Sequence, residues 1–442
     1  MKTIRYSAMG FAAALAVAAA AEPARPDLGG RVANPDGSPI TNATILVYTA
    51  APRQGTSSLC PYCYADCSKR AATGPDGDFE IKSLDPALLF RLLVLAPGHE
   101  SKFVDKVNPA GGAVKAVLEP LDVEATPPDL RIEGLVIAED GQAVAGATIQ
   151  IQGASVGNGS QSWGQTGLFV NQIVVSDAQG RFLIRCKSGV ELAYAMAFAR
   201  GAAPRPVQLR PGRDCLIRMQ EGVVVTGRVV ADGRPVARAV VGVCPAAQAL
   251  GEVFSSDRIA TDSDGRFSLL NLPAEKSLIL SGTMDSLRGK GALTPKQFMS
   301  GKNKTTTDLG DVALQPGYLV AGQILLADGK PVPERTRLLL AREGVSDYSE
   351  VALDADGRFE FQTVPAGSVS LSARIKGYKF SQRNPSLDWA NGFILGKVDR
   401  DITNLTLLLE PGEFRFDPNP ANRPEGVEAQ PRDKPLRSAA KP

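Results

Sequence analysis

Residues 30–45 read GRVANPDGSPITNATI, which is an apolar strand, an Asp-Gly turn and a second apolar strand. The same arrangement recurs as GLVIAEDGQAVAGATI at 134–149, GRVVADGRPVARAVV at 227–241 and GQILLADGKPV at 322–332. An internal repeat of this length sets the architecture, because each copy is one structural unit that recurs along the chain. The sequence therefore predicts four similar modules and no single large catalytic core.

A second turn lies inside each repeat and leads into a strand with Phe near its start. The four copies are PDGDFEI at 75–81, DAQGRFL at 177–183, DSDGRFSL at 262–269 and DADGRFEF at 354–361. Gly takes positive φ without a Cβ clash, so Asp-Gly between apolar runs predicts a hairpin. The alternation after the turn places every second side chain on one face, as the buried face of a two-layer sandwich requires. In the third and fourth copies, Arg266 and Arg358 follow the Asp-x-Asp-Gly sequence, whereas a calcium loop would need further oxygen ligands, so we interpret these two as Asx-type turns.

A closing apolar strand ends each repeat, at 114–120, 215–219, 312–317 and 405–412. No segment shows a sustained helical period, and each repeat has room for about seven strands. The sequence thus predicts an all-β protein of four tandem antiparallel β-sandwich domains of the immunoglobulin or transthyretin-like type. We place the domains at 28–121, 130–221, 222–316 and 317–412. Because almost no linker separates the last three, we expect a semi-rigid rod.

The repeated motifs Gly-Arg-Val, Asp-Gly-x-Pro-Val, Asp-x-Asp-Gly-Arg-Phe, Gly-Tyr and Leu-x-Pro-Gly resemble those of the carboxypeptidase regulatory-like domain, a transthyretin-like sandwich. The resemblance covers nearly the whole mature chain and is best in the third and fourth repeats. The second repeat has Gly201 without a following Tyr, and the first has His99 at the Tyr position. The resemblance implies an extracytoplasmic and mostly non-catalytic protein. Some members of the family are grouped with carbohydrate-binding-like folds.

The two ends of the chain are not expected to belong to the sandwiches. Residues 1–21 have the positive start, the Ala-rich apolar stretch and the small-residue cleavage site of a signal peptide. Residues 413–442 are Pro-rich and polar, which predicts a disordered tail. Loss of Lys2 and Arg5 with the signal would balance the remaining cations against 47 acidic residues. We therefore expect a secreted or periplasmic protein that neither binds nucleic acid nor stays inserted in a membrane.

Three of the six cysteines, Cys60, Cys63 and Cys67, form the segment CPYCYADC inside an insertion of the first repeat. A disulfide-locked loop with one odd thiol suits an oxidising compartment. A zinc site completed by Asp66 or His99 is one alternative, and a thiol-redox pair is another. Attachment of c-type haem would need His in place of Tyr64. We predict no bound metal or cofactor.

Cys186 and Cys215 lie on two predicted strands of the second repeat. We expect them to form a disulfide, which would contribute about 3–4 kcal/mol by closing a loop of about 30 residues. Two buried free thiols are the open alternative.

Catalysis is not expected, because the mature chain has a single His, His99, and no phosphate-binding Gly loop. Binding is better supported, since insertions fall at matching places in the repeats, at 49–72, 153–172, 244–260 and 342–352. Trp163, Tyr62 and Tyr64 in these insertions are candidate ligand-binding residues. A late insertion in the third repeat, 283–308, is rich in Lys and Arg and is either a solvated loop or a site for an acidic partner.

These features predict a non-enzymatic, exported binding or scaffold protein of the cell envelope. Its partner would be a polysaccharide or an envelope protein, contacted through loops at the ends of the sandwiches. The alternative is a thiol-redox or metal-binding protein centred on Cys60, Cys63 and Cys67.

Overall fold

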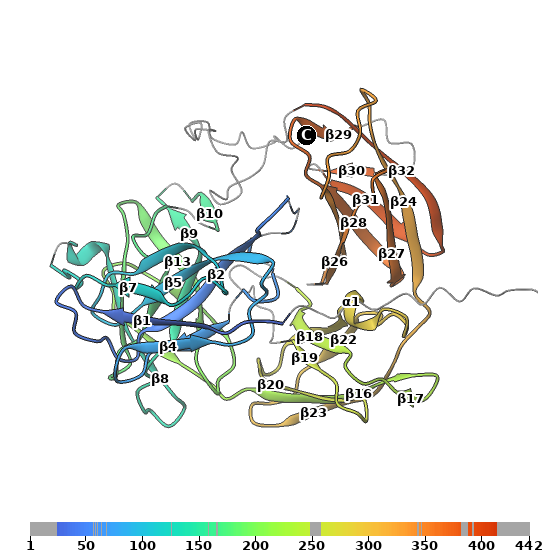
Figure 1. Cartoon of the computed structure of the whole chain (residues 1–442). Coiled ribbons are helices and arrows are strands. Elements are labelled where there is room, and N and C mark those ends of the chain that lie inside the picture. The colour runs from blue at the N-terminus through green and yellow to red at the C-terminus, as the bar shows by residue number, and fades with distance from the viewer. Residues whose placement is uncertain are drawn as a thin grey trace, which may run out of the picture.

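The protein is a series of β-sandwiches, seen in a computed structural model (Figure 1). The structure describes residues 24–412 except 56, 58, 60, 63, 68, 125, 158, 165–166, 248–257, 343, 346, 382–387 and 391–392, and it omits the side chains of 388–390 and 393–396. The predicted signal peptide (1–21) and tail (413–442) lie outside this range. Within it, no helix has both the length and the apolar character needed to cross a bilayer.

Domains 1 and 2 each consist of two facing sheets. In domain 1 the sheets are β4-β1-β7 and β3-β2-β5-β6, with strands β1 Leu28–Ala33, β2 Thr44–Pro52, β3 Arg70–Ala72, β4 Asp78–Ile81, β5 Leu88–Leu95, β6 Lys102–Val107 and β7 Val114–Val117. A 3₁₀ turn, η1 (Pro128–Leu130), leads into domain 2. There the sheets are β12-β8-β15 and β10-β9-β13-β14, with β11 also on β9; the strands are β8 Arg131–Ile137, β9 Thr148–Val156, β10 Gln161–Trp163, β11 Ile173–Val175, β12 Arg181–Arg185, β13 Val190–Phe198, β14 Arg205–Leu209 and β15 Cys215–Arg218.

Domains 3 and 4 repeat this plan. Domain 3 has sheets β17-β16-β20, with β23 also on β16, and β19-β18-β21-β22; its elements are β16 Val223–Ala231, β17 Arg234–Pro235, β18 Val240–Pro245, β19 Ile259–Ala260, β20 Arg266–Leu272, β21 Ser277–Gly282, α1 Met284–Leu287, β22 Lys296–Met299 and β23 Thr306–Ala313. Domain 4 has sheets β27-β24-β32-β29 and β26-β25-β28-β31-β30, with β24 Tyr318–Leu326, β25 Arg337–Arg342, β26 Tyr348–Ala352, β27 Arg358–Val364, β28 Gly367–Ala373, β29 Tyr378–Phe380, β30 Asp388–Ala390, β31 Phe393–Val398 and β32 Ile402–Pro411.

The all-β sandwich fold is as predicted, with one added feature in every domain. The first strand pairs antiparallel with the strand after the second turn and parallel with the closing strand, as in β1–β7, β8–β15, β16–β23 and β24–β32. The closing strand therefore returns beside the first strand after the chain has crossed to the other sheet. The remaining strand pairs are antiparallel, as predicted.

The repeated Gly and Phe of the sequence lie opposite each other on neighbouring strands. The pairs are Gly30–Phe79, Gly134–Phe182, Gly227–Phe267 and Gly322–Phe359. A Cβ at position 30 would lie 2.5 Å from the Phe79 ring and 2.5 Å from the carbonyl oxygen of Val114. The ring thus lies across the glycine in the space that a side chain would take. This contact explains why the two motifs recur together.

In domains 2, 3 and 4 the second turn has the geometry expected of an Asx turn, whereas in domain 1 Gly74 stands where the other repeats have Asp. In domain 3 the carboxylate of Asp262 accepts hydrogen bonds from the backbone N–H groups of Asp264 at 2.9 Å and Arg266 at 2.8 Å. Gly265 has φ of 71°, and its carbonyl accepts from Val229 N–H at 2.8 Å. The corresponding glycines 77, 180 and 357 make the same bond to the first strand. The Asp oxygen is thus used by the turn itself, which supports the turn over a calcium loop.

A buried hydroxyl that the sequence analysis did not single out recurs in the first three domains. Thr73 Oγ1 donates to the carbonyl of Ile40 at 2.6 Å and accepts from Ala43 N–H at 2.8 Å. Ser176 and Thr261 make the equivalent two bonds in domains 2 and 3. Each hydroxyl satisfies two backbone groups where the chain enters the second sheet.

Replacement of Thr73 by Val, which keeps the shape, should lower the free energy of unfolding of domain 1 by about 2 kcal/mol, because two buried backbone groups lose their partner. Amide hydrogen exchange of peptides from domain 1 measures this change. Thr41→Val is the matched control, since Thr41 is exposed and its hydroxyl lies 3.4 Å from its acceptor. Equal exchange in the two variants would contradict the assigned role.

The four domains do not form the expected rod. Domain 1 contacts domain 4 directly, because Ser57 Oγ donates to Glu350 Oε1 at 2.5 Å, across 293 residues of sequence. Figure 1 shows domains 1 and 2 together on one side and domains 3 and 4 on the other. The expectation of a rod was wrong because side chains in the insertions make contacts between domains that no sequence period reveals.

Candidate binding surface

The most exposed aromatic feature of domain 2 is Trp163 on β10. Trp163 and Tyr194 both pair with Gly153 of β9, one from each side, so their rings meet over the glycine. The ring centroids are 5.1 Å apart with an interplanar angle of 24°, which is a stacked arrangement. A Cβ at Gly153 would lie 2.6 Å from the Trp163 ring. The glycine therefore permits the stack, and the stack fixes the indole.

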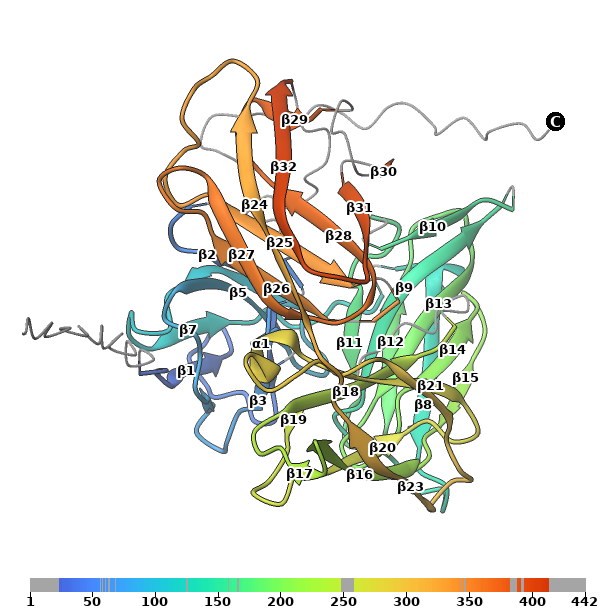
Figure 2. The same ribbon diagram turned by 90° about the vertical axis from the view of Figure 1, so that its right-hand side faces the viewer.

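The two stacked rings differ in exposure. Tyr194 is 6% exposed, whereas Trp163 is 42% exposed. The side-chain amide of Gln161, two residues before Trp163, donates to the Tyr194 hydroxyl at 3.3 Å. The β9–β10 hairpin extends from the edge of domain 2 in Figure 2. The surface thus offers a fixed aromatic face with an amide beside it.

Tyr62 and Tyr64, predicted as one group, separate in the structure. Tyr62 is 46% exposed and makes an edge contact with Tyr48, at 5.2 Å between ring centroids. Tyr64 packs against the core of domain 1. Burial, with a further contribution from the charge of Glu350 in domain 4, raises the pKa of Tyr64. Tyr64 is therefore part of the contact between domains 1 and 4. No ring contact in the described part of the chain joins either tyrosine to Trp163.

Within the cysteine-rich insertion, Cys60 and Cys63 lie outside the described residues. The Cys67 thiol donates to the carbonyl of Pro61 at 3.2 Å. The carboxylate of Asp66, buried beside it, accepts from Arg25 at 2.6 Å, from Lys69 at 2.8 Å and from the backbone of Asp85 at 2.7 Å. These bonds attach the insertion to the rest of domain 1.

The two residues suggested as additional metal ligands are thus engaged elsewhere. Two cations neutralise Asp66, and the ring nitrogens of His99 contact the carbonyl of Pro97 at 2.9 Å and Asn34 Oδ1 at 2.8 Å. His99 connects two turns of domain 1, which agrees with a packing role. Neither residue supports the metal hypothesis for this loop.

The expected disulfide between Cys186 and Cys215 is not formed, and both thiols are free. Cys186 N–H bonds to the carbonyl of Leu130, and Cys215 pairs with Gly134, from opposite sides of β8. The two cysteines lie two strands apart in the sheet and are offset by four residues along β8. Their Cα atoms are therefore roughly 16 Å apart. A disulfide needs Cα atoms within about 7 Å. The expectation was wrong because the register of the sheet, which the sequence did not reveal, keeps the residues apart.

The thiols of Cys186, which is buried, and Cys215, which is partly buried, should react slowly with alkylating reagents. Burial raises the pKa of each to about 11, with Asp214 adding to the effect at Cys215. Because the thiolate is the reactive form, alkylation of folded protein should be slow at pH 8 and should accelerate on unfolding. Iodoacetamide labelling followed by peptide mass spectrometry measures both rates. Recovery of a peptide disulfide-linked through Cys186 and Cys215 would contradict the free-thiol assignment.

Cations in the late insertion of domain 3 mostly have partners within the protein. Lys290 Nζ donates to the carbonyls of Ala237 and Ser286, both at 3.1 Å, and Lys296 Nζ donates to that of Leu309 at 3.0 Å. Arg288 pairs with Asp285 at 3.2 Å, and Lys304 with Glu139 of domain 2 at 2.7 Å. The insertion therefore stabilises domain 3 and its neighbours, which weakens the hypothesis of an acidic partner.

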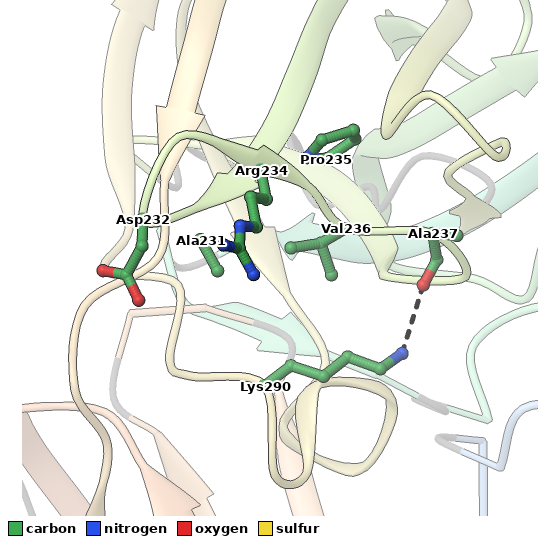
Figure 3. A pocket seen from close by; sticks show the side chains of 7 residues that line it. All are labelled: Ala231, Asp232, Arg234, Pro235, Val236, Ala237 and Lys290. Carbon is green, nitrogen blue, oxygen red and sulfur yellow. Dashed lines mark hydrogen bonds between the residues drawn. The ribbon is translucent and has the colours of Figure 1, made fainter.

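A concavity of about 580 Å³ lies beside Lys290 in the same domain. Figure 3 shows Arg234 and Val236 on the hairpin that forms one side and Lys290 on the other. It is open to solvent, and Lys290 of the 283–308 insertion is the one lining residue that belongs to a region predicted from the sequence as a candidate site. The concavity is lined by one carboxylate, Asp232, and by two cations, Arg234 and Lys290. It therefore favours neither anionic nor cationic ligands.

Three of the four insertions predicted to carry recognition are used in contacts between domains. The insertions of domains 1 and 3 both contact the insertion of domain 4. The contacts are Ser57 with Glu350 at 2.5 Å, Cys244 Sγ with the carbonyl of Gly344 at 3.9 Å, and the Arg258 guanidinium over the Tyr348 ring at 5.4 Å. They join the insertions of domains 1, 3 and 4. No sequence pattern predicts these contacts, because each depends on single side chains from distant segments. None of these three contacts involves the insertion of domain 2, which contains Trp163.

No protein-family model matches the sequence, and no curated protein matches it. Among solved structures, the Bacillus anthracis TIE protein is similar at 10% identity, with 87% of this chain and 73% of that chain covered and a TM-score of 0.19. A streptococcal ancillary pilin shares 13% identity over 66% of this chain and 99% of its own, with a TM-score of 0.22. The major pilin subunit of Bacillus cereus shares 10% identity over 66% and 100%, with a TM-score of 0.17. Because all three scores are below 0.5, we base no functional argument on these similarities.

Proposed function

We propose that this chain is an exported, non-enzymatic binding or scaffold protein of the cell envelope, and that it binds a polysaccharide on the Trp163 face of domain 2. The observation that carries the proposal is the stack of Trp163 on Tyr194 over Gly153. An aromatic ring that is exposed yet held in place offers binding area at little cost in conformational entropy. The amide of Gln161 provides hydrogen-bonding capacity beside it.

A sugar ring suits this surface better than a charged ligand. The apolar C–H face of a pyranose can pack on the indole, while its hydroxyl groups bond to amides and hydroxyls at the rim. The insertion around Trp163 is rich in Gly, Ser, Asn and Gln, which provides such groups without charge. The near balance of acidic and basic residues in the mature chain also favours a neutral ligand.

We also propose that the four domains are divergent members of the carboxypeptidase regulatory-like class, exported through the 1–21 signal. The pairing of Gly with Phe on neighbouring strands in all four domains supports a common origin of the repeats, since the two motifs that define the resemblance meet there. The occupied contacts of His99 and Asp66 support a binding role over a catalytic or metal-linked one.

An array of bacterial and plant polysaccharides, probed with the purified mature chain and with Trp163→Ala, tests the ligand. We expect saturable binding to at least one neutral glycan, weakened about tenfold or more in Trp163→Ala, as for loss of one stacked aromatic contact. Phe103→Ala is the matched control, because Phe103 is an aromatic residue of domain 1 with similar exposure, at 38%. Equal loss in both variants, or binding only to envelope proteins, would reject the glycan site on Trp163.

A further inference from the structure

Contacts between the four domains differ in kind. Domains 1 and 2 share an apolar cluster that consists of Tyr48, Leu93, Leu95, Ile173 and Val175, all buried. Arg185 of domain 2 also pairs with Glu100 of domain 1 at 2.5 Å, and Ser101 bonds to Asn171 at 2.8 Å. An apolar cluster closed by buried polar bonds resists separation, so domains 1 and 2 move as one body.

Domains 3 and 4 are joined at least as firmly. Met284 of α1 belongs to domain 3 in sequence but is buried in the core cluster of domain 4. Its backbone N–H donates to Asp347 at 3.1 Å, and Asp347 pairs with Arg342 at 3.2 Å in a buried contact. Arg342 in turn donates to the carbonyl of Leu293 in domain 3 at 3.3 Å. Domains 3 and 4 are therefore a second body.

The connection between these two bodies is short and polar. In the described part of the chain, no apolar core cluster has members from both domain 2 and domain 3. Glu139 of domain 2 accepts from Asn303 at 2.6 Å and from Lys304 at 2.7 Å, and Gly222, at φ of 91°, lies at the junction. Lys304 is half exposed, so its ion pair contributes little. A few residues at the end of an element are the usual site of a hinge.

The second connection is the insertion of domain 1 against domain 4. Ser57, which is buried, donates to Glu350, and Glu350 is also paired with Arg337 at 3.1 Å. Gly55 lies so close to domain 4 that a Cβ there would be 2.9 Å from the carbonyl oxygen of Arg335. On the side of domain 1, Asp66 fixes the same insertion through its bonds to Arg25 and Lys69.

We infer from these contacts that the chain is a two-jaw clamp. Domains 1 and 2 form one jaw, domains 3 and 4 the other, Gln220–Gly222 is the hinge, and Gly55 and Ser57 of the domain 1 insertion form a latch on domain 4. Figure 1 shows the chain crossing between the two jaws through the segment between β15 and β16. The latch and the hinge are polar connections, so they open before either jaw comes apart. The inference does not depend on a glycan site at Trp163.

Single-molecule energy transfer on the full mature chain tests the clamp, with fluorophores on unnatural amino acids at the exposed positions 115 and 400, one in each jaw. Wild-type protein should show one dominant distance. Combining Ser57→Ala with Glu350→Ala should raise the ratio of open to closed molecules about tenfold, as for loss of one charge-assisted hydrogen bond. Adding Glu139→Ala, which releases the hinge, should widen the distribution further.

Two controls make the test decisive. Ser38→Ala with Glu360→Ala removes the same groups from exposed positions of domains 1 and 4 and should leave the distribution unchanged. A label pair at positions 115 and 213, both in the first jaw, should not respond to any latch variant. If the double latch variant loses its fold by circular dichroism, Gly55→Ala replaces it. Identical distributions for latch and control variants, or a response of the same-jaw pair, would overturn the clamp.

Discussion

Replacing Gly30 by Val is expected to lower the free energy of unfolding of domain 1 by at least about 3 kcal/mol, at the upper end of the usual cost of overpacking. The new side chain would meet the Phe79 ring and the carbonyl oxygen of Val114, both 2.5 Å from its Cβ. The ring could turn, but the carbonyl belongs to the closing strand β7, which pairs parallel with β1. Relief of the clash must therefore shift a backbone strand of the core.

The adjacent residue provides the control for this substitution. Gly29 faces the other side of β1, where the nearest atom to a new Cβ is 3.8 Å away. Gly29→Val should thus leave the stability of domain 1 nearly unchanged, since Val also favours a strand more than Gly does. Hydrogen exchange measures this effect in peptides from residues 28–121, with peptides from the other domains as the reference. This local measurement is needed because a protein of four domains need not unfold in two states. Equal protection of the two variants would refute the proposed Gly–Phe packing.

Replacing Asp347 by Ala should destabilise the junction of domains 3 and 4 by about 3–5 kcal/mol, because it leaves a buried cation without its partner. Arg342 and Asp347 have side chains only 5% and 1% exposed. Burial raises the pKa of Asp347, while the N–H of Met284 and the charge of Arg342 act in the opposite direction. The carboxylate also holds Met284 in the core of domain 4. Its loss should therefore separate the two domains as well as weaken domain 4.

Thermal unfolding and hydrogen exchange at α1 and β26 measure this effect. Asp356→Ala is the matched control, since Asp356 is an exposed Asp of the same domain and its nearest cation lies 4.0 Å away. Replacing both Arg342 and Asp347 by Leu should be far less damaging than Asp347→Ala, because neither charge then remains buried. A fall of 1 kcal/mol or less for Asp347→Ala would show that the pair does not hold the junction.

The sequence predicted the repeating parts of the structure because their physical causes are local. An Asp-Gly turn needs positive φ at Gly265, and the alternation that follows it assigns Phe267 to the buried face. Both requirements lie within a few residues, so they appear in every copy. The same reasoning could have found the hydroxyl of Thr73, since Ser176 and Thr261 stand at matching positions, three residues or fewer before the second turn.

The arrangement of the domains could not be predicted in this way. The contact of Ser57 with Glu350 depends on two polar residues in insertions that share no pattern. The expectation of a disulfide failed for a related reason, because the register that separates Cys186 from Cys215 is set by pairing with β8. The candidate binding residues are predicted as aromatics in the insertions, and only the structure shows that Trp163 is exposed while Tyr64 packs into domain 1 next to domain 4.

These results change how the insertions are understood. Loops at the ends of sandwiches often carry recognition, and the sequence alone would assign all four insertions to that role. In the structure, the insertions of domains 1, 3 and 4 contact each other and hold the domains together. The proposed glycan surface is therefore confined to domain 2.

Small-angle X-ray scattering of residues 22–442 tests most directly whether the four sandwiches form one closed assembly. A single compact body of this size has a radius of gyration of about 22 Å, and four domains in a line would give roughly 40 Å. We predict a value close to the lower figure and a scattering curve that matches the structure. A radius near the upper figure would show that domain 1 does not rest on domain 4, and would contradict both the closed arrangement and the clamp.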